Sequence, residues 1–136
     1  MTKDQAKRQT AAFFRRLGEK QEIFAERNFV KARVGEAFLG FEYDETDGIL
    51  SCQALIYRFR REPRDEILDA AFAEENRTGG GRVVFDSQSL ALYLQRDYAE
   101  KTDDAVFDEE VRRLAADSLV WSGEILGRLA ENVAPR

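Results

Sequence analysis

The alternation of hydrophobic and polar positions is clearest in residues 79–98. A glycine triplet precedes β-favouring residues at 82–85, a polar turn follows at 86–89, and leucines then occupy every second position of 90–94. This pattern predicts a β-hairpin. Because successive side chains of a strand point to opposite faces, the hairpin should carry two faces, one with Leu90, Leu92 and Leu94 and one with Ala91, Tyr93 and Gln95. The leucine face needs an apolar cover, which the helical pattern that follows could supply.

Helical periodicity predicts three helices. Residues 2–17 carry an apolar stripe, and Gly18 follows as a C-terminal stop. A second helix begins near Pro63, has two acidic residues in its first turn and ends near Asn76. The third helix follows Thr102 as its N-cap. Its apolar stripe is the longest in the chain and comprises Phe107, Val111, Leu114, Ala115, Ser118, Trp121, Ser122, Ile125, Leu126, Leu129 and Val133.

Between the first two helices, apolar side chains fall on both residue parities. Residues 29–43 fit one strand covered on both faces, or one strand bulged near Gly35 so that its parity switches. Residues 44–48 form a turn with Asp47-Gly48, and residues 49–59 return as a second strand that is also apolar on both faces. For residues 19–27 the pattern fits either a second helical piece or a connection into the sheet.

The order of elements predicts an α+β fold in one domain, residues 1–136, with three helices on a twisted antiparallel sheet. Hydrophobic residues make up 43% of the chain and charged residues 35%, which suits a globular protein with a real core. The net charge of −5 argues against nucleic-acid binding, because such binding starts from a basic surface. Without an apolar leader or a run of roughly 20 apolar residues, we expect no membrane segment and a cytoplasmic location.

The chemistry-bearing residues predict no catalytic, metal or cofactor site. The chain has no histidine, which removes histidine-based nucleophilic sites and metal ligands, and its single cysteine, Cys52, suits a buried strand position. The glycine triplet leads into a strand and lacks the spaced pattern of a phosphate loop. Adjacent acidic pairs on helices point apart and fit a solvated surface.

The chain resembles the type III secretion chaperones of the Tir-chaperone (CesT-like) group, which have the order α-β-β-β-α-β-β-α. The resemblance lies in residues 66–72, which match the second helix of that family, in 80–86 and 90–96, which match its last hairpin, and in the helix that carries Trp121. It implies a non-catalytic homodimer that holds an extended segment of an effector protein, without nucleotide or metal. Two strands are clear before the second helix, and Arg58–Arg61 stands where the resemblance implies a third. The YbjN-like domains, with a regulatory or assembly role, are the alternative; a small enzyme ranks third.

Excess apolar surface predicts where partners bind. Three helices can cover mainly one side of the sheet, so the other side calls for a second copy or an extended peptide. We expect the partner segment on six residues of the first helix and first strand pair: Phe14, Leu17, Phe38, Leu39, Phe41 and Leu50. We expect the homodimer interface on the second helix and the outer face of the last hairpin, at Ala70, Ala71, Ala91 and Tyr93.

Overall fold

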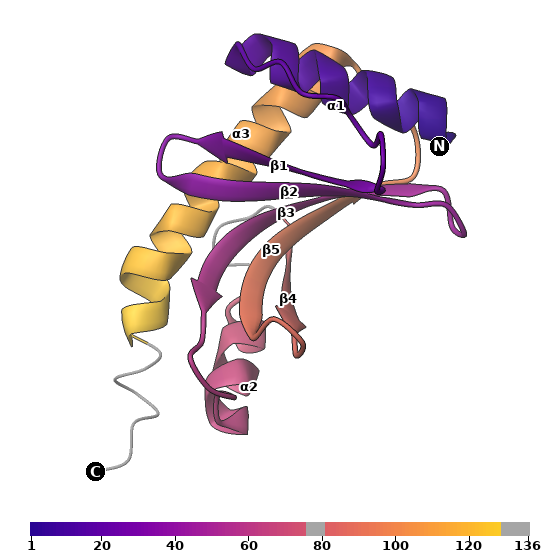
Figure 1. Ribbon diagram of the computed structural model, residues 1–136. Helices are drawn as coiled ribbons and strands as arrows, with labels where there is room; N and C mark the ends of the chain where they lie inside the picture. The colour runs from indigo at the N-terminus through magenta and orange to yellow at the C-terminus, as the bar shows by residue number, and fades with distance from the viewer. Residues whose placement is uncertain (76–80, 129–136) are drawn as a thin grey trace.

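The computed structural model describes residues 1–75 and 81–128 and shows three helices on a five-stranded antiparallel sheet (Figure 1). The strands lie in the order β1-β2-β3-β5-β4. The elements are α1 (Lys3–Leu17), β1 (Phe29–Val34), β2 (Ala37–Asp44), β3 (Ile49–Arg58), α2 (Asp65–Ala73), β4 (Arg82–Asp86), β5 (Ala91–Tyr98), α3 (Asp104–Val120) and the π-helical turn η1 (Trp121–Ile125). This confirms the predicted α+β fold, in the order of elements that the resemblance implies.

Local side-chain chemistry sets the ends of α1. The Thr2 hydroxyl accepts a hydrogen bond from the Gln5 N–H, and the Gln5 side chain accepts one from the Thr2 N–H, so the two residues form a capping box. Gly18 ends the helix at φ 77°, in the left-handed region that glycine adopts without a Cβ clash. Both ends agree with the sequence.

The start of α3 differs by one residue from the prediction. Asp103 is the N-cap, because its carboxylate accepts hydrogen bonds from the N–H groups of Ala105 and Val106. The Thr102 N–H instead donates to the Gln9 side-chain carbonyl, 2.9 Å away. That side chain also donates to Asp104, so the buried Gln9 joins α1 to the start of α3.

The prediction of a single strand over residues 29–43 was wrong. Residues 29–34 and 37–44 pair as a β-hairpin whose two-residue turn is Gly35-Glu36, with Gly35 at φ 59°. A glycine in the left-handed region allows a tight reversal, which explains why both parities looked apolar on either side of it. The region before α2 therefore holds three strands, and β3 is the third. It ends at Arg58, so Phe59, Arg60 and Arg61 lie outside the sheet.

Strand β5 begins later than the sequence predicted. Leu90 takes φ 57° in the turn, and the strand starts at Ala91. Leu92 and Leu94 are buried, but Ala91 and Gln95 on the opposite parity are buried as well. The pairing of β3 with β5 also shifts register between Leu55 and Tyr57, which places one extra residue in β3.

The core lies between the sheet and the helices α1 and α3. Its centre is a cluster of aromatic rings: Phe41 on β2 has ring centroids 5.5 Å from Phe13, 5.7 Å from Phe14 and 6.2 Å from Phe107. Trp121 is fully buried at the start of η1. Figure 1 shows α1 and α3 crossing beside the β1–β2 end of the sheet, and α2 at the opposite end.

The remaining segments resolve the open alternatives. Residues 19–27 form turns and bends rather than a helix, although Ile23 and Phe24 from this connection are buried. Helix α2 is shorter than predicted: it begins after the N-cap Arg64, and it ends at Ala73. The predicted positions Asn76, Leu129 and Val133, and the first two glycines of the triplet, lie outside the described residues.

Candidate functional site

The sheet face opposite α1 and α3 forms the candidate binding surface. Cross-strand partners in an antiparallel sheet share a face, so the register assigns its members. Along β1 and β2 they are Phe29, Lys31, Arg33, Phe38, Gly40 and Glu42. Along β3, β5 and β4 they are Ser51, Gln53, Leu55, Arg58, Ala91, Tyr93, Gln95, Asp97, Arg82, Val84 and Asp86. We call this surface the outer face.

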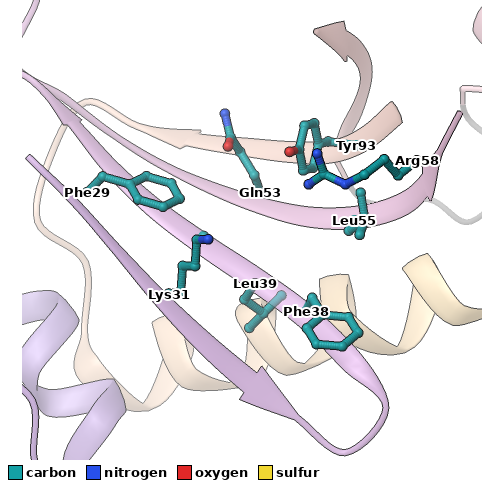
Figure 2. A pocket seen from close by; sticks show the side chains of 9 residues that line it. Phe29, Lys31, Phe38, Leu39, Gln53, Leu55, Arg58 and Tyr93 are labelled. Carbon is teal, nitrogen blue, oxygen red and sulfur yellow. The ribbon is translucent and has the colours of Figure 1, made fainter. Parts of the chain in front are cut away.

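A hollow of about 220 Å³ lies in the outer face (Figure 2). Its lining side chains come from β1, β2, β3 and β5, as Figure 2 shows from close by. The lining residues are Phe29, Lys31, Phe38, Leu39, Gly40, Gln53, Leu55, Arg58 and Tyr93. Most of them are apolar, with one amide and two cations, so the hollow can take an apolar group and contact a polar one at its rim.

The hollow exists because of a glycine. Lys31, Gly40 and Gln53 are consecutive partners in one cross-strand row, and Gly40 contributes no side chain to it. A Cβ on Gly40 would come within 2.9 Å of the Phe29 ring, so that ring lies directly over the backbone of β2. Glycine at this position therefore opens the floor of the hollow and lets an aromatic ring form one wall.

The charged groups that line the hollow are positive. Lys31 is exposed and, among the described residues, its ammonium takes part in no ion pair. Arg58 donates through Nη1 to the Ser89 carbonyl at 3.3 Å, which holds the guanidinium at the rim. Arg33 lies on the same face, with its guanidinium 5.2 Å from the centroid of the Phe38 ring.

The acidic groups of the outer face lie outside the hollow. Asp97 accepts hydrogen bonds from the Ser51 hydroxyl at 2.7 Å and from the Gln95 amide at 2.9 Å, and it forms an ion pair with Arg82 at 3.0 Å. Burial of Asp97 opposes ionisation, but these bonds together outweigh it and hold the pKa of Asp97 below its usual range. Its charge is thus compensated within the sheet.

The six residues predicted to bind a partner divide by burial. Phe14, Leu39, Phe41 and Leu50 are at most 3% exposed and belong to the core of the protomer, because their strand parity or helix face turns them towards α1, α3 and the sheet. The expectation that these four lie on an open surface is corrected by their burial, although Leu39 also borders the hollow. Leu17 is half-buried, and Phe38 is 54% exposed on the outer face.

The four residues predicted at a dimer interface divide in the same way. Ala71 and Ala91 are fully buried within the protomer, so they cannot meet a second copy directly. Ala70 is half-buried and packs against the core, and Tyr93 is half-buried at the hollow. Helix α2 also exposes Phe72, which is 41% accessible.

Sequence reasoning missed six residues of the hollow: Phe29, Lys31, Gly40, Gln53, Leu55 and Arg58. The signal for Phe29 and Leu55 was present in the apolar content of both parities. That content assigns residues to a face only once the hairpin turn at Gly35 is known, because the turn determines which residues of β1 and β2 lie on the same face. Lys31 and Arg58 carried no such signal, since charged residues on a strand usually face solvent.

The buried titratable groups lie in the core rather than at the hollow. Burial raises the pKa of the Cys52 thiol far above its usual range. Burial also raises the pKa of Tyr98. In residues 1–75 and 81–128, histidine, cysteine and carboxylate side chains form no group of three or more that could hold a metal ion. No helix of the described chain has the length and apolar character needed to cross a membrane.

Comparison with known proteins identifies the fold through structure. No protein-family model and no curated protein sequence matches the chain. A chain of the ExsC–ExsE complex superposes with a TM-score of 0.67 at 15% identity, covering 90% of this chain and 95% of that one. A chain of the HopA1–SchA chaperone–effector complex gives 0.65 at 16% identity, covering 90% and 98%.

A third structure is the heterodimeric ExoU–SpcU complex from the type III secretion system of Pseudomonas aeruginosa, with a TM-score of 0.58 at 11% identity over 81% of this chain and 92% of that one. This chain has the fold of the type III secretion chaperones. At such low identity the likeness concerns the fold, and each of the three structures is a complex of two different proteins.

Proposed function

We propose that this protein is a non-catalytic, chaperone-like homodimer that holds an extended segment of a partner protein. The observation that carries the proposal is the outer face: a sheet face opposite the helices α1 and α3, with a largely apolar hollow spanning β1, β2, β3 and β5. The similar structures are themselves complexes, one of them of a chaperone with an effector.

Strand addition offers a second means of holding such a segment. β1 and β4 are the edge strands of the sheet, and within the described part of the chain each pairs with a neighbour on one side only. An edge strand presents unpaired N–H and C=O groups to an extended peptide, and the alternate side chains of that peptide can enter pockets on the sheet face. This mode holds a segment without folding it. The proposal also places the protein and its partner segment in the cytoplasm.

The experiment compares capture of the native partner by two variants whose substituted positions are similarly exposed. The tagged wild type should co-purify a protein from its own cells, and Phe38→Asp should lose that protein, since a charge would stand in the hollow. Val106→Asp is the matched control, because Val106 is 45% exposed and lies on α3, away from the outer face. Undiminished capture by Phe38→Asp would refute the proposed surface.

A further inference from the structure

We propose that the hollow selects a segment in which a large apolar side chain is flanked by carboxylates. This inference rests on the proposed function and deepens it, because it assigns the chemistry of the segment that the outer face binds. The chain carries a net charge of −5, which by itself would favour basic or neutral partners. The charge at the hollow has the opposite sign.

The size of the hollow suits a bulky apolar side chain. A cavity of about 150 Å³ lined by apolar residues admits a benzene molecule, and this hollow measures about 220 Å³. The Phe29 ring, the exposed Phe38 and the half-buried Leu55 supply apolar walls, and the Gly40 backbone supplies the floor. Such a site would bury a leucine or aromatic side chain of the segment.

The rim of the hollow supplies the charge preference. Lys31 and Arg58 come from β1 and β3 and are the only titratable groups in the lining apart from Tyr93. Arg58 keeps further N–H donors beyond the one given to Ser89, and Arg33 stands nearby on the same face. The outer-face acids Glu42, Asp86 and Asp97 do not line the hollow; Asp97 is paired with Arg82, and Asp86 interacts electrostatically with Arg58.

Strand geometry connects the two preferences. In an extended peptide, residues i and i+2 share a face and lie about 6.6–6.8 Å apart. When the central side chain enters the hollow, carboxylates two positions before and after it point to the same face, where Lys31 and Arg58 stand on different strands. A basic residue at those positions would be repelled by Lys31 and Arg58, so a segment with basic flanking residues would bind more weakly.

The test uses three fluorescein-labelled peptides with a central Phe and either Glu, Gln or Lys two positions on each side, measured by fluorescence anisotropy at low salt. We expect the Glu peptide to bind the wild type about tenfold or more tightly than the Lys peptide, with the Gln peptide between them. In the double variant Lys31→Glu/Arg58→Glu the order should reverse. Lys7→Glu/Arg15→Glu is the matched control: it changes net charge equally, on exposed or half-exposed positions of α1, and should keep the wild-type order.

Gly40→Val separates this inference from the proposed function. The added side chain would occupy the hollow and leaves both cations in place, and its Cβ would come closer than 3 Å only to the movable ring of Phe29. We expect it to weaken the binding of all three peptides together, with Gly40→Ala as a milder second variant.

An unchanged order of peptide affinities in Lys31→Glu/Arg58→Glu overturns the charge preference, while loss of binding in Gly40→Val still supports the surface. If no peptide binds the wild type, or if Gly40→Val splits a dimer in light scattering, the inference is overturned, and capture by Phe38→Asp decides the proposed function separately.

Discussion

Phe38 and Phe41 lie three residues apart on β2 and face opposite sides of the sheet. Phe41 is fully buried among Phe13, Phe14 and Phe107, whereas Phe38 is 54% exposed. Phe41→Ala should lower the free energy of unfolding by about 3–5 kcal/mol, because it removes buried surface and leaves a cavity. Phe38→Ala should change it by about 0.5 kcal/mol or less. Urea unfolding measures both; equal losses would contradict the assignment of the two faces.

The environment of Asp97 predicts that the stability of the protein depends on pH. Its pKa is held low in the folded protein: burial opposes ionisation, but hydrogen bonds from Ser51 and Gln95 and the ion pair with Arg82 outweigh it. A carboxyl whose pKa is lower when folded than when unfolded stabilises the protein above its ordinary pKa near 3.9, and this stabilisation is lost as pH falls. Asp97→Asn should therefore lose less stability than the wild type between about pH 5 and pH 3. Parallel curves in chemical unfolding across that range would contradict it.

At the scale of elements, α2 is incompletely covered by its own protomer. Only Ala71 of its nine residues is fully buried, and Phe72 is 41% exposed. A helix of this length is marginal without packing. A second copy that covers α2 and the outer face of the hairpin β4–β5 would supply that packing. The proposed homodimer interface therefore keeps Ala70 and Tyr93 from the sequence prediction and adds Phe72.

The dimer prediction concerns two charged substitutions. Phe72→Asp and Tyr93→Glu should each convert a dimer into a monomer, since each would bury an unpaired charge between the copies. Light scattering at micromolar concentration measures the state, and Val106→Asp on α3 serves as the control that stays dimeric. A monomeric wild type would refute the interface.

Another element-scale prediction contrasts two glycines. Gly81 directly precedes β4 and has φ 83°, and an added Cβ would come within 2.8 Å of Leu114 on α3 and 3.0 Å of the Gln95 carbonyl. Gly81→Ala should therefore destabilise the fold by about 1–2 kcal/mol or more through backbone strain and the close contact. Gly123 in η1 has nothing within 4 Å of its Cβ position, so Gly123→Ala should stabilise by up to about 1 kcal/mol. Thermal unfolding compares the two variants, and a stabilised Gly81→Ala would contradict the close approach of Leu114 to Gly81.

For the whole molecule, we predict that folding needs no metal and no nucleotide. A ligand that binds only the native state raises its apparent stability, so removal of a required ligand would lower the melting temperature. Exhaustive chelation should leave that temperature unchanged, and addition of zinc, calcium or ATP should not raise it. A shift of several degrees in either experiment would reveal a site that the sequence did not indicate.

The sequence by itself determined the features that depend on neighbouring residues. The ends of α1 follow from Thr2, Gln5 and Gly18, whose interactions span a few positions, and the turn at Gly48 follows from the left-handed backbone that glycine permits. The α+β order follows from periodicities that each element carries within itself. These predictions agree with the structure because their physical causes are local.

Only the tertiary structure decided which apolar residues are core and which are surface. A strand with two apolar parities gives no local sign of the face that helices cover, so Phe41 and Leu50 resembled binding residues until α1 and α3 were packed over them. The hollow joins residues as far apart as Phe29 and Tyr93, and it depends on a row in which Gly40 stands between Lys31 and Gln53. Such a site arises from register between strands, which is set by long-range burial and turn geometry.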